Sequence, residues 1–276
     1  MDRRRFLTLS ASGLLVATLP VLRPLDALAA TTKSVSYGSG KLDIYSPDTS
    51  GAPVIVYVHG GAWKAGSKGQ VGAMPGYFNN RGYVFVSVGY SLGSNVGQQA
   101  NQVGQAINWV RTNAASFGGD GRRVAVMGHS AGCHLSSLAV LSGRAQGVRA
   151  LVANDTAAYD LAYLAEINND RLPILYAGPF KDRSKWREWS PITYAGGGGG
   201  LPVLVAWSGG RDREAISQRF ANALESAGHP VIRFDGRGYN HISISKAVGR
   251  QRDPLNRAVT QFLDSVLGAP AEAAAN

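Results

Sequence analysis

The sequence predicts an α/β fold, in which helices flank a mostly parallel sheet of about eight strands. The first observation is that short apolar runs rich in β-branched residues alternate with segments of helical length. The second is that several of these runs are apolar almost throughout, as expected of strands covered by helices on both faces. These runs are Val54–Val58, Val84–Val88, Val124–Met127 and Val203–Trp207.

The remaining strands and the helices follow in order along the chain. Lys33–Tyr37 and Lys41–Tyr45 flank the turn signal Gly38-Ser-Gly40, which predicts an N-terminal hairpin. Val148–Val152 and Val231–Phe234 complete the predicted strands. Helices are expected over Gln98–Ala115, Ala131–Leu141, Glu214–Ala227 and a C-terminal stretch that ends at Leu267. The segment from Asp155 to Gly200 shows no clear strand and is rich in Trp and Tyr, so we expect a small cap between the sixth and seventh strands.

Residues 1–29 differ from the rest of the chain. Arg3-Arg4-Arg5 precede a short apolar stretch and a small-x-small site at 27–29, the pattern of an export signal. The paired arginines followed by Phe-Leu resemble a bacterial twin-arginine signal. The apolar stretch is shorter than the roughly 20 residues needed to span a bilayer, so we expect cleavage rather than an anchor. The predicted organisation is a signal over 1–29, one catalytic domain over 30–268 and a disordered tail over 269–276.

The formal charge of +10 includes four arginines and two aspartates of the signal, so the remaining chain keeps +8. Basic clusters such as Lys181–Arg187 are interleaved with acids, and no nucleic-acid-binding motif accompanies them. We interpret these clusters as solvated surface, with weak attraction to an anionic partner as the alternative. The single cysteine, Cys133, excludes an internal disulfide and is interpreted as a packing residue.

The most informative motif is Gly128-His-Ser-Ala-Gly132, which directly follows the strand ending at Met127. A Gly-x-Ser-x-Gly pentapeptide between a strand and a helix is typical of a nucleophile elbow, where the serine hydroxyl is exposed above the sheet. Glycine is needed at both ends because side chains would collide across the turn. Ser130 is therefore the predicted nucleophile, provided that a base and a carboxylate lie nearby.

A serine nucleophile needs a histidine to take its proton and a carboxylate to orient that histidine and stabilise its positive charge. Such groups are expected at the carboxyl ends of parallel strands. The loop after the seventh strand presents Asp212, and the loop after the eighth presents His241. We therefore predict a triad of Ser130, Asp212 and His241 in this chain order.

Other residues compete for these roles. Glu214, Asp235 and Asp182 are the alternatives to Asp212. The four remaining histidines all lie before the last predicted strand and are weaker candidates for the base: His59, His129, His134 and His229.

A glycine-containing loop after the third strand, His59-Gly-Gly-Ala-Trp63, predicts an oxyanion hole. Its backbone N–H groups can donate to the negative charge that develops on a substrate oxygen. We expect the donors to be Gly61 and Ala62, with Gly60 as an alternative, together with Ala131 directly after the nucleophile. His59 is interpreted as a structural residue that hydrogen-bonds this loop.

These motifs, with the late Gly-x-x-Asp that ends at Asp212 and the final Asn-His that ends at His241, resemble the α/β-hydrolase superfamily. Within it the chain is similar to the carboxylesterase branch, which includes feruloyl and acetyl esterases and kynurenine formamidase-like enzymes. Ala62 stands where the lipase-type motif has a third glycine, which favours the formamidase and feruloyl-esterase side. The resemblance extends from Leu42 to the last helix and implies ester hydrolysis without a metal or organic cofactor.

Three functions follow as hypotheses. The first is a serine hydrolase that cleaves carboxylic esters of small or polymer-derived substrates, and the second is an aryl-formamide amidohydrolase. The third, a catalytically silent envelope binding module, is disfavoured because the motifs are complete, and a serine peptidase is weaker still. The expected partner is a small-molecule ester, with no nucleic acid and no stable membrane insertion, in a periplasmic or secreted protein. Trp63, Trp186 and Trp189 are candidate pocket residues, whereas the physiological substrate and the oligomeric state are not indicated.

Overall fold

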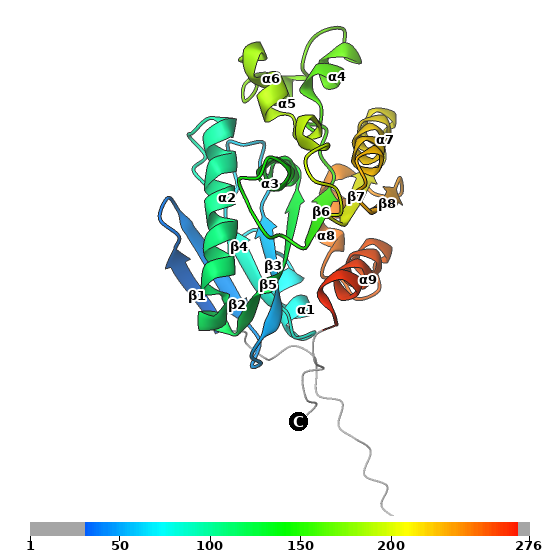
Figure 1. Cartoon of the computed structure of the whole chain (residues 1–276). Coiled ribbons are helices and arrows are strands. Elements are labelled where there is room, and N and C mark those ends of the chain that lie inside the picture. The colour runs from blue at the N-terminus through cyan, green and yellow to red at the C-terminus, as the bar shows by residue number, and fades with distance from the viewer. Residues whose placement is uncertain (1–30, 270–276) are drawn as a thin grey trace, which may run out of the picture.

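The computed structural model of the chain describes residues 31–269. One sheet runs through them with strand order β1-β2-β4-β3-β5-β6-β7-β8 (Figure 1). β2 pairs antiparallel with β1 and β4, and all other pairs are parallel, as the sequence predicts. The strands are β1 (Thr31–Ser36), β2 (Lys41–Ser46), β3 (Ala52–Val58), β4 (Val84–Val88), β5 (Gly119–His129), β6 (Ala150–Asn154), β7 (Val203–Ser208) and β8 (Val231–Gly236).

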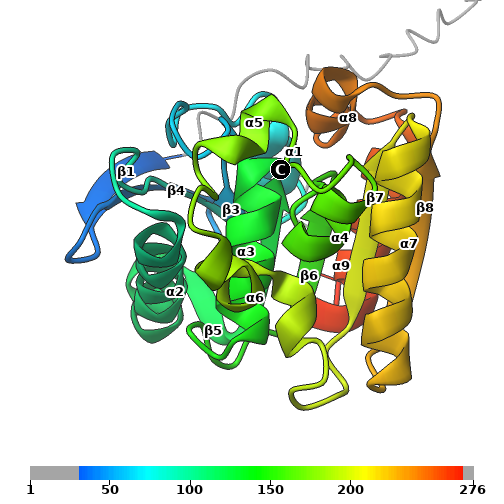
Figure 2. The ribbon, with the colours of Figure 1, turned by 90° about the horizontal axis from the view of Figure 1, so that it is seen from above.

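Helices cover both faces of this sheet (Figures 1 and 2). One face carries α2 (Val96–Asn113), α3 (Ala131–Leu141) and α7 (Arg211–Ser226). The other face carries α1 (Met74–Asn79), α8 (His241–Ala247) and α9 (Pro254–Leu267). No helix among the residues described has both the length and the apolar character needed to cross a membrane.

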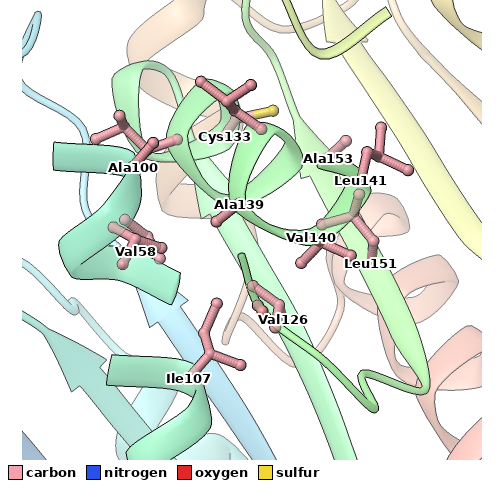
Figure 3. Packing of buried hydrophobic residues seen from close by; sticks show 14 of the residues in the cluster. Val58, Ala100, Ile107, Val126, Cys133, Ala139, Val140, Leu141, Leu151 and Ala153 are labelled. Carbon is pink, nitrogen blue, oxygen red and sulfur yellow. The ribbon is translucent and has the colours of Figure 1, made fainter. Parts of the chain in front are cut away.

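Strand alternation divides the core into two layers. In β3, Val56 and Val58 pack with α2 and α3, whereas Ile55 and Tyr57 face α1 and α9. Successive side chains of a strand point to opposite faces, so a strand buried on both sides must be apolar throughout. Figure 3 shows the first layer, where α2 and α3 cover the central strands.

The cap predicted between β6 and β7 is present. It contains α4 (Leu161–Glu166), α5 (Ile174–Ala177) and α6 (Trp186–Trp189), which gather at one end of the sheet (Figure 1). Short 3-10 segments also occur at Ala114–Phe117, Arg183–Lys185 and Pro191–Tyr194.

Several element boundaries differ from the prediction, and two of these differences affect the site. β6 ends at Asn154 rather than Val152, and α7 begins at Arg211 rather than Glu214. The first shift moves Asp155 to the end of a strand, and the second moves Asp212 into a helix. The predicted signal over 1–29, and all of the predicted tail except residue 269, lie outside the described residues and stay predictions.

Candidate active site

Ser130 occupies a strained turn between β5 and α3. Its φ of 57° lies in the left-handed region, which a side chain rarely adopts without support from its surroundings. The two flanking glycines are needed for close backbone packing. A Cβ on Gly132 would lie 2.0 Å from the Val58 carbonyl oxygen, and one on Gly128 would lie 2.4 Å from the Gly132 carbonyl oxygen. The turn is held further by the Ser130 N–H, which donates to the Asn154 carbonyl at 3.2 Å.

Ser130 and His241 come together as the sequence predicts. His241 Nε2 lies 2.9 Å from Ser130 Oγ, and His241 Nδ1 lies 2.7 Å from Asp155 Oδ2. Because a carboxylate can only accept, Nδ1 carries the proton and Nε2 is free to accept the serine proton. The three side chains thus form one hydrogen-bonded chain from carboxylate to hydroxyl.

The carboxylate in this chain is Asp155, and the choice of Asp212 is corrected. Asp212 lies exposed in the first turn of α7. There the positive end of the helix dipole stabilises a carboxylate. The predicted alternatives also lie elsewhere. Asp235 pairs with Arg237 on the surface. The Asp182 side chain accepts the Ser184 N–H at the start of a 3-10 segment between β6 and β7.

Asp155 is fully buried and held from several sides. Its Oδ1 accepts the Ser208 N–H at 3.0 Å and the Arg213 guanidinium at 3.1 Å. Burial opposes ionisation, but the hydrogen bond from His241 and the charge of Arg213 outweigh it and hold the pKa of Asp155 well below its usual range. The carboxylate is therefore charged at neutral pH and oriented through both oxygens.

A sequence signal for Asp155 exists. It lies between Ser130 and His241 in the chain, so the order Ser, Asp, His holds for it as well as for Asp212.

The backbone of Asp155 is strained in the same way as that of Ser130. Its φ of 57° repeats the geometry of Ser130 at the end of the neighbouring strand. Ala62 and Trp63 in the loop after β3 are also in this region, so four of the six non-glycine residues with positive φ in the described chain surround one site.

His241 is positioned by the start of α8. The Asn240 side chain accepts the N–H groups of Ile242 and Ser243, which caps this helix one residue before His241. His129 Nε2 donates to the His241 carbonyl at 3.0 Å. Burial and the neighbouring His241 lower the pKa of His129 to about 4, so His129 supports the loop as a neutral ring.

The loop after β3 lies beside Ser130. Gly60, Gly61 and Ala62 line the same cavity as Ser130 and His241. Gly61 has a φ of 127°, and a Cβ there would lie 2.0 Å from the Ala65 carbonyl oxygen, so only glycine fits. Ala131 is the first residue of α3, and a first-turn N–H has no acceptor within its own helix.

His59 has a structural place in this loop, in line with its interpretation. Its Nδ1 donates to the Gly60 carbonyl at 2.7 Å, and its ring stacks on Tyr90 with centroids 4.4 Å apart. Burial lowers the pKa of His59.

His129, Asp155 and His241 also offer ligand atoms within 4.8 Å of one another, a spacing that a metal ion could use. Two features oppose this use. His241 Nδ1 donates a hydrogen bond to Asp155 Oδ2, and the positive Arg213 guanidinium already lies against Asp155 Oδ1. A cation would have to displace these contacts, so the donor set fits a hydrogen-bonded triad better than a metal centre.

A family model, BD-FAE, matches residues 42–214, which is more than half of the chain. The chain belongs to the BD-FAE family. The matched segment runs from β2 to the start of α7 and includes the loop after β3, Ser130 and Asp155.

Curated relatives and solved structures agree with this family. Esterase LipQ of Mycobacterium tuberculosis is 30% identical over 93% of this chain and 67% of its own length. Kynurenine formamidase of Danio rerio is 28% identical over 88% of this chain and 84% of its own length. A truncated carbohydrate esterase from gut microbiota shares the fold with a TM-score of 0.72, at 19% identity over 88% of this chain and 99% of that one. The BD-FAE chain is thus placed among carboxylic ester hydrolases of the α/β-hydrolase fold.

The three tryptophans predicted for the pocket do not line the cavity of this BD-FAE domain. Trp63 is buried, and its Nε1 donates to His134 Nδ1 at 3.2 Å. Trp189 is buried too, and its carbonyl accepts from His134 Nε2 at 2.7 Å. Trp186 Nε1 donates to the Phe180 carbonyl at 2.7 Å within the cap. The pocket assignment is therefore corrected: the Trp63 ring and the Trp189 carbonyl contact His134 of α3, and Trp186 bonds within the cap.

Proposed function

We propose that this protein hydrolyses carboxylic esters through an acyl-enzyme formed on Ser130. The observation that carries the proposal is the chain of hydrogen bonds from Asp155 through His241 to Ser130, at 2.7 Å and 2.9 Å. In this proposal Asp155 takes the role first expected of Asp212. Membership of the BD-FAE family and similarity to proteins named esterases support the same reaction.

In the first half-reaction, His241 Nε2 takes the proton of Ser130 Oγ as this oxygen attacks the ester carbonyl carbon. The carbonyl π electrons move onto the oxygen, and the N–H groups of Gly61, Ala62 and Ala131 donate to it. A single donor of this kind contributes about 2.7–4 kcal/mol. Asp155 stabilises the imidazolium formed on His241.

The tetrahedral intermediate then collapses. The bond from the carbonyl carbon to the leaving oxygen breaks, and His241 gives its proton to that oxygen, which releases the alcohol. Water enters and attacks the acyl-enzyme while His241 takes its proton. The second collapse returns the proton to Ser130 and releases the acid.

The experiment is hydrolysis of short-chain p-nitrophenyl esters by the purified protein. Ser130→Ala should fold normally and lose on the order of 10⁴–10⁶ in kcat, since the groups of a triad act as a unit. Ser136→Ala, six residues further along the chain in α3, is the matched control and should keep its rate. A phosphonylating reagent should label Ser130, and labelling of any other residue in an inactivated sample would overturn the assignment.

An aryl-formamide is the second candidate substrate. The similarity to the Danio rerio kynurenine formamidase over 84% of that protein favours it. The same triad can attack a formamide carbonyl, with an amine in place of the alcohol as leaving group. Comparing kcat/KM for N-formylkynurenine with that for phenyl acetate decides between them, and a value at least 100-fold higher for the formamide would replace the esterase proposal.

We also propose that the protein is exported and acts in the periplasm or outside the cell. The arginine-rich start and small-x-small site of residues 1–29 support this. Mature protein should begin near Ala30 or Thr31. Replacing Arg4 and Arg5 together by lysine should block export, and normal export of that variant would exclude the twin-arginine route.

A further inference from the structure

The cavity above Ser130 has a volume of about 790 Å³, within the size range of small-molecule sites. Ser130 and His241 contribute to its lining, and further lining residues come from α1, α5 and α8 (Figure 2). Much of the wall is apolar, including Met74, Leu175 and Ile242. An ester seated here would place a hydrophobic body against this wall.

The charged side chains of the cavity wall all carry positive charge. The charged residues that line the cavity are Lys246 and Arg250, and no acidic residue of the described chain lines it. Within residues 31–269 neither side chain has an ion-pair or hydrogen-bond partner. Some other cations of the cap and of α7 are paired, as Lys185 is with Glu188 and Arg219 with Asp160. Two unpaired cations thus border an otherwise apolar cavity.

We propose that the leaving group of the natural ester carries an anion, a carboxylate or a phosphate, that Lys246 and Arg250 bind. This inference rests on the proposed esterase function. The side of the substrate follows from α8. His241 begins this helix and gives its proton to the leaving oxygen, so the leaving group must lie beside His241, and the wall next to it is α8.

The distance follows from the same helix. Lys246 is five residues beyond His241, which at 1.5 Å per residue is about 7.5 Å along the axis. Arg250 lies in the turn after α8, where its N–H donates to the Ala247 carbonyl. An anion separated from the ester oxygen by about the length of an aromatic ring would reach these cations while the ring contacts Ile242.

The test compares two acetate esters of the same phenol ring, 4-acetoxybenzoate with a free carboxylate and methyl 4-acetoxybenzoate with that carboxylate methylated, and it follows release of acetate from each. We expect the wild-type protein to prefer the anionic ester in kcat/KM, and added salt to weaken that preference by screening. In the double variant Lys246→Gln/Arg250→Gln, the ratio of the two kcat/KM values should fall about tenfold. Arg252→Gln removes an exposed cation outside the cavity lining and should leave the ratio unchanged.

The outcomes separate this inference from the function on which it rests. Cleavage of both esters with a ratio that the double variant does not change would overturn the anion site and leave the esterase proposal standing. Cleavage of neither ester, with no labelling of Ser130, would overturn both. A second pair, p-nitrophenyl hemisuccinate and p-nitrophenyl butyrate, places the charge on the acyl part. A charge preference that Lys246 and Arg250 control only in this pair would overturn the assignment to the leaving group.

Discussion

The regions at the ends of β6 and β7 contribute different groups to the same carboxylate. The loop after β6 supplies Asp155 itself, in a strained left-handed conformation. The last residue of β7 and the first turn of α7 supply the groups that hold it, the N–H of Ser208 and the guanidinium of Arg213. The first region therefore carries the carboxylate, and the second carries its support.

This division is possible because β6 and β7 are neighbours in the sheet. Their register pairs Asn154 with Ala206, and the Asp155 N–H donates to the Ala206 carbonyl at 2.9 Å. A carboxylate placed just after either strand lies at the same edge, within reach of a histidine that follows β8. The comparison teaches that the triad constrains the position of the acid relative to the imidazole and leaves open which strand delivers it.

The largest effect is expected when the carboxylate of Asp155 itself is replaced. Asp155→Asn keeps the shape of the side chain but favours the wrong tautomer of His241, so kcat should fall by about 10⁴ near neutral pH. Asp212→Asn is the matched control, and it should stay within about threefold of the parent because Asp212 is exposed on α7. Rates on a p-nitrophenyl ester measure both. Collapse of the Asp212 variant with an active Asp155 variant would return the acid to the loop after β7.

The exchange of these two aspartates shows where the sequence stops being informative. The elbow and the loop after β3 could be predicted because each follows a strand whose apolar run is continuous, and His241 could be predicted because no other histidine follows the last predicted strand. The end of β6 could not be fixed. Ala150–Asn154 and the predicted Val148–Val152 are both apolar enough to be strands, and the end at Asn154 depends on pairing with β5 and β7. A shift of two residues then hid Asp155 inside the predicted cap.

The tryptophans illustrate a second gap. Aromatic residues near a site fit a pocket wall and a packed cap equally well on sequence alone. Only the contacts of Trp63 and Trp189 with His134 distinguish the two. These contacts join segments that are 55 and 71 residues apart, and no local pattern encodes them.

The next effect tests the support that Arg213, in the first turn of α7, gives to Asp155. Arg213→Gln removes the positive charge that pairs with the fully buried carboxylate of Asp155. We expect the free energy of unfolding to fall by about 2–3 kcal/mol, since one partner of a largely buried pair is lost. Denaturant unfolding at pH 7 measures this. Arg219→Gln on the same helix is the control, and its exposed pair with Asp160 should contribute less than about 1 kcal/mol.

The same variant has a pH signature. The low pKa of Asp155 contributes stability that is present above the pKa of an unfolded aspartate, near 4, and is lost as pH falls through the folded value. Without Arg213 the folded pKa rises, so the variant should lose less stability than the parent between pH 5 and pH 2. Parallel acid profiles for the two proteins would contradict a role for Arg213 in holding this charge.

A smaller effect on rate is expected where the loop after β7 contacts the loop that carries His241. A Cβ on Gly209 would lie 2.7 Å from the Arg237 carbonyl oxygen and 3.2 Å from the Tyr239 carbonyl oxygen. Gly209→Ala should therefore displace the segment before His241 and lower kcat about tenfold, since a misplacement of about 1 Å can cost 10²-fold. Gly238→Ala, where a Cβ meets nothing within 4 Å, is the control and should leave kcat unchanged. Equal rates for the two variants would show that this contact does not position His241.

His134, on the side of α3 that faces the cap, should affect stability rather than rate. Burial lowers the pKa of His134 to about 4, from the usual 6.5. The unfolded chain therefore takes up a proton near pH 6.5 that the folded chain refuses, so this histidine makes stability fall as pH drops from about 6.5 towards 4. At pH 5 the loss is about 2 kcal/mol relative to pH 7, since each pH unit below the unfolded pKa costs about 1.4 kcal/mol.

The variant His134→Gln cannot titrate. It should be less stable than the parent at pH 7, because two hydrogen bonds are lost or weakened. The difference in stability between the two proteins should shrink by about 2 kcal/mol at pH 5. Unfolding midpoints at both pH values measure this, and a difference that stays constant would mean that His134 is protonated in the folded protein.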